Sequence, residues 1–257
     1  MSSVKIVGII PAHMASIRFP KKILFDIHGL PMIEHVRRRA LLSKELDDVL
    51  VATCDVEIAD AIEFYDGKVI MTNNSHKNGT SRVAEVVNNY DCSHALLLQG
   101  DEPLLLPQHI DSIIHSIKKN PEKDAWNATG SINIEDELDL YSFVKCAVTK
   151  DNKIMHCFRK TPYFSDIKIQ QKFVRKILGV IAYRKDFLLK LNQLSESEIE
   201  SAEFIEQMRI IESGYDLYSV PVTPSLPSIN EPHEVDIVLE RLMSDPEQSY
   251  ILKQILL

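Results

Sequence analysis

The chain has 257 residues, of which 45% are hydrophobic and 26% charged, so it can bury a sizeable core and is neither disordered nor fibrous. Its formal net charge of −8 argues against a protein that binds nucleic acid or acidic membrane surfaces, because such proteins usually carry a basic footprint.

The sequence has no signal-peptide pattern in residues 1–8 and no apolar run of the ~20 residues that a membrane span needs. The four cysteines, at positions 54, 92, 146 and 157, follow neither a metal-binding nor a C-x-x-C spacing. We therefore expect a cytoplasmic protein with free thiols that does not associate with membranes.

Strands and helices alternate in the first half of the chain. Short apolar, β-branched runs predict strands at 4–12, 48–53, 68–72 and 95–99. Amphipathic patterns predict helices at 31–42, 56–65 and 81–89. This alternation predicts an α/β protein with a doubly wound, mostly parallel central sheet. In such sheets ligands bind beyond the carboxyl ends of the strands, here in the loops 13–22 and 100–103.

The pattern is looser after about residue 120. It predicts strands at 143–148, 178–183 and 217–222 and helices at 185–194, 198–213 and 233–243, with a proline-rich loop at 224–232. No change of composition marks a linker between domains, so we expect one domain over residues 1–257.

Two loops carry residues suited to a nucleotide and a metal. Arg18, Lys21 and Lys22 place three cations in the loop after the first strand, and several cations are what a polyphosphate requires, although a solvated basic loop is an equal alternative. Asp101 and Glu102 follow an apolar strand directly, and carboxylates at such a position suit magnesium.

Two further segments are candidates for ligand contact. Arg82 lies in the first turn of a predicted helix, where the helix dipole disfavours a cation, which suggests a ligand or simply a surface arginine. Glu203, Glu206, Gln207 and Ile210 have the spacing of one helix face, which suggests a helix that lines a cleft or a solvated face. P-loop, dinucleotide-binding and nucleophile-elbow motifs are missing from the sequence.

These segments together resemble the 3-deoxy-manno-octulosonate (Kdo) cytidylyltransferase family over nearly the whole chain. The family pattern I-I-P-A-R-x-x-S-x-R-x-P-x-K-x-L is similar to residues 9–24, and D-I-x-G-x-P-M-I-x-H-V is similar to residues 26–36. S-G-T-x-R-x-A-E-V resembles residues 78–86, and Q-G-D-E-P is present unchanged at 99–103. Weaker matches follow at residues 144–145, Arg159, 178–184 and 200–209.

The resemblance implies a Rossmann-like nucleotidyltransferase fold of the glycosyltransferase-A-like kind, in which about residues 130–220 form the sugar-binding and dimerisation part. It implies a magnesium-dependent reaction in which a hydroxyl of an acidic 3-deoxy sugar attacks CTP and releases pyrophosphate, for lipopolysaccharide or capsule synthesis. The implied partners are CTP, the sugar acid and a second copy of the chain.

The resemblance also implies roles for single residues. Catalysis falls to Asp101, Lys22 and Arg18, and the metal to Asp101 and Asn230. The nucleotide would be bound by Pro11, Ala12, His13, Ser16, Arg18, Lys22, Asn78, Gly79, Thr80, Arg82 and Gln99. The sugar would be bound by Gln99, Arg159, Lys176, Tyr183, Glu206 and Gln207.

Three positions depart from the family pattern. His13 stands where the family has arginine, which weakens the expected grip on phosphate, because a neutral imidazole cannot form the guanidinium fork. Asn230 stands where the family has a second metal-binding aspartate, although the neighbouring Glu231 could compensate, and Lys176 replaces a sugar-contacting histidine. These departures leave open a relative with a different sugar or nucleotide, or a non-catalytic nucleotide-binding homologue.

Overall fold

The central sheet is built around the first strand. The computed structural model describes residues 4–16 and 18–257, and its strand β1 (Ile6–Ala12) pairs in parallel with β4 (Asp48–Thr53) and with β6 (His94–Leu98). The sheet order is β11-β7-β10-β6-β1-β4-β5, with β5 at Val69–Met71, β7 at Ala125–Gly130 and β11 at Leu217–Pro221. This topology confirms the predicted α/β fold with a mostly parallel sheet.

One long strand runs against its neighbours. β10 (Val174–Arg184) pairs antiparallel with β6 on one side and with β7 on the other, and its register against β7 shifts between Ile177 and Ile181. The irregular stretch contains Leu178, Gly179 and Val180, and it lies beside the carboxyl end of β6, because the backbone N–H of Gln99 donates to the carbonyl of Gly179. A bulge of this kind redirects a strand locally.

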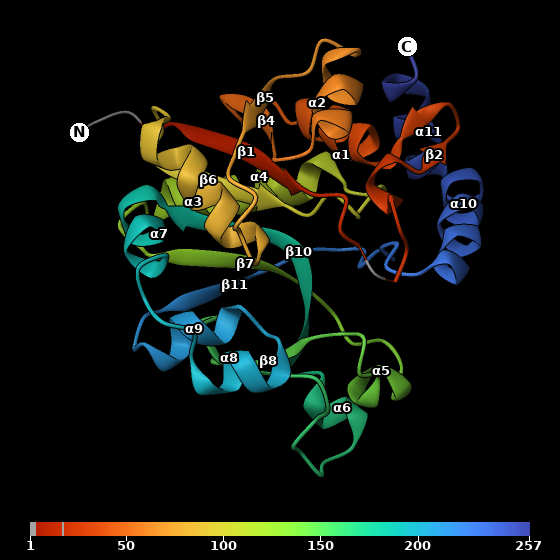
Figure 1. Cartoon of the computed structure of the whole chain (residues 1–257). Coiled ribbons are helices and arrows are strands. Elements are labelled where there is room, and N and C mark those ends of the chain that lie inside the picture. The colour runs from red at the N-terminus through yellow and green to blue at the C-terminus, as the bar shows by residue number, and fades with distance from the viewer. Residues whose placement is uncertain (1–3, 17) are drawn as a thin grey trace.

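Helices cover both faces of this sheet (Figure 1). Alternate residues of β1 enter two cores: Ile6 and Ile10 pack with α1, whereas Val7 and Ile9 pack with α3. The first face carries α1 (Met32–Leu41), α2 (Val56–Glu63), α4 (Pro107–Lys119), α10 (Val235–Ser244) and α11 (Pro246–Ile255). The second carries α3 (Gly79–Asn89), α7 (Lys185–Leu191), α8 (Glu198–Glu203) and α9 (Gln207–Glu212).

A smaller unit, which we call the arm (residues 131–176), extends from the main sheet at the bottom of Figure 1. It contains α5 (Asp136–Asp139), β8 (Lys145–Val148), β9 (Ile154–Phe158), α6 (Ile167–Gln170) and the first residues of β10. β8 pairs antiparallel with both β9 and β10, and a third core of Ile132, Leu138, Ala147, Phe158 and Val174 fills it.

The remaining elements are short. β2 (Asp26–Ile27) and β3 (Leu30–Pro31) form a separate hairpin, and 3-10 turns occupy Lys22–Leu24 and Pro232–Glu234. All four cysteines are free thiols, and Cys146 faces Cys157 across β8 and β9, where burial raises the pKa of both. None of the described helices is long and apolar enough to cross a membrane.

The prediction of one helix over residues 198–213 is wrong. Phe204 adopts a left-handed conformation with φ of 55°, which ends α8 and separates it from α9. Glu203 and Glu206 therefore lie on opposite sides of a break and do not share one helix face, as the spacing had suggested. Several elements were not predicted, among them α4, β7, β9 and α11 and the short α5, α6 and β2–β3 hairpin.

Candidate active site

The loops that follow the parallel strands meet at one edge of the sheet. Pro11 and Ala12 end β1, and Gly79 at the start of α3 lies so close to them that a Cβ there would be 3.0 Å from Pro11 Cγ. The backbone N–H of Met14 donates to Asp55 Oδ2 at 2.9 Å, so the loop after β1 is tied to the loop after β4. This edge is where a parallel sheet places its ligands.

Lys22 and Asp101 form the centre of the site. Lys22 Nζ lies 2.6 Å from Asp101 Oδ2 and 3.2 Å from the carbonyl oxygen of Ile229, and both charged side chains are largely buried. The backbone N–H of Ile229 in turn donates to the Asp101 carbonyl at 3.0 Å. Three segments far apart in the sequence thus converge on one charge pair. Both residues of the pair, Lys22 and Asp101, were predicted as catalytic.

The segment after Ile229 brings Asn230 and Glu231 to the same place. Both backbone N–H groups donate to Glu234 Oε2, and Asn230 Nδ2 donates to Ser228 Oγ at 2.9 Å. Among residues 4–16 and 18–257 nothing donates a hydrogen bond to Asn230 Oδ1, so this oxygen remains available for a ligand. Glu231 forms an exposed ion pair with Arg18 at 3.7 Å, which links the third predicted catalytic residue to this segment.

Glu102, which the sequence analysis paired with Asp101 as a magnesium carboxylate, is instead engaged with the backbone of β10. Its Oε1 accepts a 2.8 Å hydrogen bond from the Gly179 N–H, and a Cβ on Gly179 would lie 2.2 Å from that oxygen. Burial, and secondarily the charge of Asp101, raises the pKa of Glu102 to about 7. Gln99 lies beside Gly179 and is exposed, so a substrate can reach its side chain.

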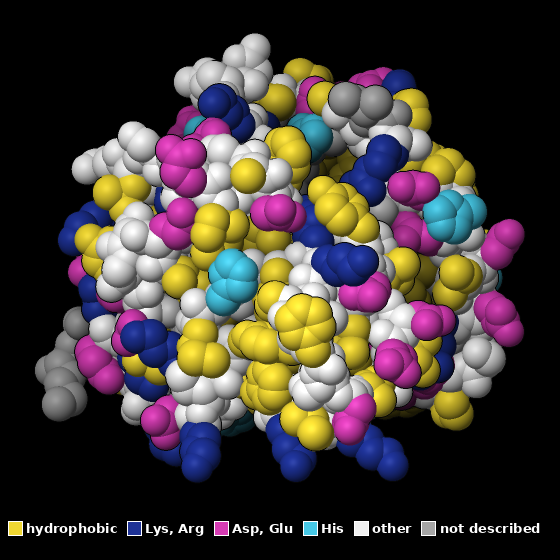
Figure 2. Space-filling view, turned by 90° about the horizontal axis from the view of Figure 1, so that it is seen from below, with side chains coloured by type: hydrophobic (Ala, Val, Ile, Leu, Met, Phe, Trp, Pro, Cys, Tyr) yellow, Lys and Arg dark blue, Asp and Glu magenta, His cyan; other side chains and the backbone are white. Residues whose placement is uncertain are grey.

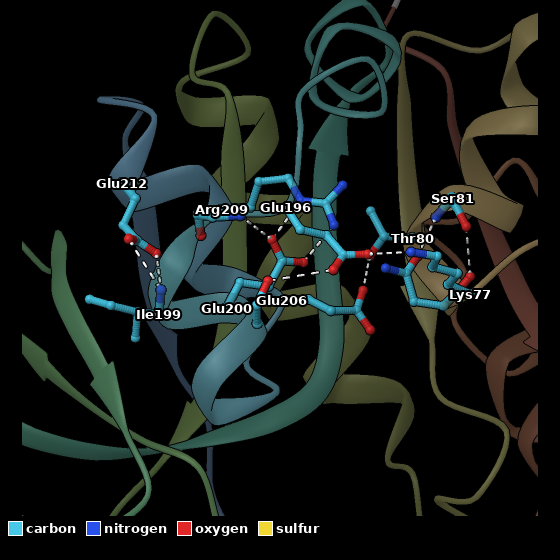
Figure 3. A network of polar contacts seen from close by, with 12 residues as sticks. Lys77, Thr80, Ser81, Glu196, Ile199, Glu200, Glu206, Arg209 and Glu212 are labelled. Atoms are coloured by element: carbon cyan, nitrogen blue, oxygen red, sulfur yellow. Dashed lines mark hydrogen bonds and ion pairs between the residues drawn. The ribbon is translucent and has the colours of Figure 1, made fainter.

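Residues 78–82 connect the nucleotide side to the sugar side of the predicted site. Asn78 caps α3 by accepting from the Ser81 N–H, and Thr80 Oγ1 donates to Glu206 Oε2 at 2.7 Å (Figure 3). Thr80 Oγ1 also lies 3.3 Å from the hydroxyl of Tyr183, and burial raises the pKa of both Tyr183 and Glu206. A pocket lies between this loop and α9.

Arg82 is buried and its contacts are internal. Its guanidinium donates to Thr72 Oγ1, to the Asn73 carbonyl and to Cys54 Sγ, so it ties α3 to the ends of β5 and β4. The position of Arg82 in the first turn of α3 thus has a structural reason, because its guanidinium binds the loops that surround the site.

The loop residues His13 and Ser16 hydrogen-bond within their own loop. His13 is exposed and its Nδ1 accepts from the Ala15 N–H at 3.2 Å, and Ser16 Oγ accepts from the Phe19 N–H at 3.4 Å. Both side chains belong to the loop that carries Arg18 and Lys22, which is consistent with their predicted place on the nucleotide side.

Two of the predicted sugar-binding residues lie at the arm. Arg159 donates to the carbonyls of Glu203, Phe204 and Tyr141 at 2.8, 3.1 and 3.0 Å, and so it braces the break between α8 and α9. Lys176 is paired with Glu137 at 2.6 Å inside the arm, and both side chains are largely buried. Gln99, Tyr183, Glu206 and Gln207 lie at the main sheet, where β6, β10 and α9 meet.

Comparison with known proteins identifies the family of this chain. A family model described as cytidylyltransferase matches residues 7–218. The chain belongs to the cytidylyltransferase family. The 3-deoxy-manno-octulosonate cytidylyltransferase of Geotalea uraniireducens is 35% identical over 251 residues, covering 93% of this chain and 99% of that protein. The protein of the same name from Escherichia coli is 33% identical over 228 residues, covering 89% and 92%.

Solved structures agree with this assignment. A CMP:2-keto-3-deoxy-manno-octonic acid synthetase complexed with CTP superimposes with a TM-score of 0.88 at 32% identity, covering 94% of this chain and 99% of that one. The 4-diphosphocytidyl-2C-methyl-D-erythritol synthase from Anaerococcus prevotii superimposes with a TM-score of 0.65 at 15% identity, covering 93% and 96%, which shows a common fold only. The predicted family and nucleotidyltransferase fold are thereby confirmed.

Proposed function

We propose that the protein transfers CMP from CTP to a hydroxyl of Kdo or a similar acidic 3-deoxy sugar, with Mg²⁺ as cofactor. The product would serve lipopolysaccharide or capsule synthesis in the cytoplasm. The observation that carries the proposal is the Lys22–Asp101 pair held against Ile229 at the carboxyl edge of the sheet. The relatives named for this reaction, and the CTP-bound neighbour, support it.

The reaction is a displacement at phosphorus. The sugar hydroxyl oxygen bonds to the α-phosphorus of CTP while the bond from that phosphorus to the pyrophosphate oxygen breaks, and the hydroxyl proton is released. Negative charge builds up on the departing pyrophosphate. Arg18 and Lys22 would stabilise this charge, because their present partners are the carboxylates of Glu231 and Asp101, which phosphate oxygens can replace.

The residues around Asp101 fit a magnesium ion. Within the described residues no cluster of three or more His, Cys, Asp or Glu side chains is arranged to hold a metal. Magnesium usually takes only one or two protein carboxylates and completes its shell with water and phosphate, so Asp101 and the available Asn230 amide oxygen suffice. When bound, the ion would neutralise charge on the triphosphate, and Asp101 and Asn230 would hold it there.

The sugar acid would bind where β6, β10 and α9 meet. Gln99 is exposed at that point, Glu206 and Tyr183 converge on Thr80, and Gln207 begins α9. The arm would complete this site, since Arg159 binds the carbonyls of Glu203 and Phe204 where α8 ends. Residues 130–220 would therefore form the sugar-binding part of a single domain.

The arm would also form the interface of a homodimer. Apolar side chains gather near the middle of the face seen from the side of the arm (Figure 2). A large contiguous apolar patch on a surface marks an interaction site, whereas scattered single apolar side chains do not. The exposed apolar residues of the arm are Ile134, Leu140, Tyr141, Met155, Phe164 and Ile169.

Asn230 and His13 favour a second candidate, a homologue that binds nucleotide without turnover. The Asn230 amide can coordinate a metal but brings no negative charge. The His13 imidazole cannot make the paired hydrogen bonds to a phosphate that an arginine guanidinium makes. The Thr80–Glu206 bond speaks for the first candidate, because Glu206 would contact the sugar acid, which a protein that only binds nucleotide does not take up.

Pyrophosphate release distinguishes the candidates. The purified protein is incubated with CTP and magnesium and with either Kdo or its 8-amino analogue, and CTP binding is measured by calorimetry on the same sample. Release with one sugar acid supports the proposed transferase and identifies its substrate. CTP binding without pyrophosphate release in the presence of any sugar acid supports the non-catalytic homologue, and release with a different acceptor would change the sugar assigned.

A further inference from the structure

A fully buried asparagine occupies the irregular stretch between β7 and β10. Asn127 of β7 is 0% exposed, and its Nδ2 lies 2.9 Å from the carbonyl oxygen of Ala128, 2.9 Å from that of Leu178 and 3.3 Å from that of Val180. Carbonyl oxygens accept hydrogen bonds and cannot donate them. The NH₂ end of the Asn127 amide must therefore face these three carbonyls.

This orientation determines that of Gln207. The Asn127 Oδ1 points away from the carbonyls and lies 3.1 Å from Gln207 Nε2. An amide oxygen only accepts, so Gln207 has to present its NH₂ end to Asn127. The reverse orientation would set two amide oxygens against each other and leave a buried acceptor without a donor, which is unfavourable.

The oxygen end of the Gln207 amide has no donor among the described residues. Gln207 is half-buried at the first position of α9, and no group in residues 4–16 or 18–257 donates a hydrogen bond to its Oε1. Its neighbour Glu206 is bonded to Thr80 on the nucleotide side (Figure 3). Gly179, in the irregular stretch of β10 that Asn127 contacts, is hydrogen-bonded to the Gln99 N–H and to the Glu102 carboxyl.

We propose that Asn127 is a positioning residue that holds Gln207 with its amide oxygen toward the sugar acid, so that this point of the site selects a hydrogen-bond donor. The donor would be a hydroxyl or a protonated amine of the sugar. The inference rests on the proposed function for the identity of the ligand as a sugar acid. The orientation of the two amides follows from their own contacts and does not depend on it.

The consequence is a preference that can be measured. A sugar acid in which the matching hydroxyl is replaced by hydrogen or fluorine cannot donate, so Gln207 Oε1 remains without a partner in the complex. Losing one such bond costs about tenfold or more in kcat/KM. A substituent that can only accept would be disfavoured in the same way.

The first test is a set of sugar acids with single hydroxyls replaced by hydrogen or fluorine. With the natural chain one analogue should lose about tenfold or more in kcat/KM, and with Gln207→Met or Asn127→Leu this loss should shrink to less than about threefold. The KM for CTP should stay unchanged, and Gln193→Met, on an exposed glutamine after α7, should behave as the natural chain. An equal loss in the natural chain and in Gln207→Met overturns the proposal.

The second test needs no turnover. In ¹⁵N–¹H spectra of the whole protein, the side-chain amide protons of Asn127 should exchange with water at least about a hundredfold more slowly than those of the exposed Asn192. The Asn127 resonances are assigned as those that disappear in Asn127→Leu. If that variant does not fold, they are assigned as the side-chain amide resonances that shift in Gln207→Met. Fast exchange overturns the proposal. If no sugar acid reacts but exchange is slow, the proposed function fails while the hydrogen bonds that fix Asn127, and through its Oδ1 the amide of Gln207, are supported.

Discussion

Replacing Glu102 by glutamine should remove a pH dependence of stability. The Glu102 carboxyl is held by the Gly179 N–H at 2.8 Å beside Asp101, and burial raises its pKa to about 7. Glutamine has nearly the same shape and keeps an oxygen for that N–H, but it does not titrate. The variant therefore separates the charge of Glu102 from its packing.

The size of the effect follows from the pKa values. The folded-state value of about 7 exceeds the ordinary value of 4.5, and each pKa unit corresponds to about 1.4 kcal/mol. Between these two values the folded state holds a proton that the unfolded state has lost, so the free energy of unfolding falls as pH rises. Full ionisation of Glu102 above pH 7 should therefore cost about 3 kcal/mol.

Urea unfolding of the metal-free protein between pH 5 and pH 8 measures this cost. The free energy of unfolding of Glu102→Gln, taken relative to the natural chain, should increase by about 2–3 kcal/mol over that range. Other titrating groups contribute equally to both proteins and cancel in the difference. Glu63→Gln, on the exposed side of α2, is the matched control for the same change at the surface. A difference for Glu102→Gln that stays constant within about 0.5 kcal/mol would refute the reasoning.

Three further variants test the site itself. Asp101→Asn should reduce magnesium-dependent pyrophosphate release at least about a hundredfold without unfolding the protein, because the carboxylate that would hold the metal is lost; undiminished release would exclude that role. Asn230→Asp should lower the magnesium concentration for half-maximal release about tenfold, and an unaltered requirement would mean that this residue does not reach the metal. Thr80→Val should cost about 1–2 kcal/mol of unfolding free energy, because the buried Glu206 loses its donor, whereas Thr80→Ser should cost less; equal costs in urea unfolding would contradict the bond.

Local sequence signals predicted the first four parallel strands of the fold and the helices between them correctly. The strands β1, β4, β5 and β6 are short apolar runs, and β1, β4 and β6 bury both faces between two helical layers. The basic loop with Lys22 and the turn with Asp101 were expected at one sheet edge for the same reason. Their meeting at 2.6 Å is a direct consequence of parallel strands that end together.

The second half shows where local signals are insufficient. The pattern of residues 198–213 has helical spacing, yet Phe204 is left-handed. Arg159 from the arm binds the carbonyls of Glu203 and Phe204 and so stabilises this break. β7 contains Asn127 and Thr129, polar residues that are buried only because β10 and β11 supply their partners. α4, by contrast, has isoleucines at helical spacing and could have been predicted.

The sequence by itself determined the alternation of strands and helices, the family and the residue types at the site, since these depend on neighbours along the chain. The tertiary structure decided the pKa of Glu102, the orientation of Gln207 and the approach of Ile229 to Lys22. Each of these depends on β10 running against its neighbours or on the C-terminal segment returning to the sheet edge. Such contacts join residues far apart in sequence, and no local pattern encodes the partner that each buried polar group will meet.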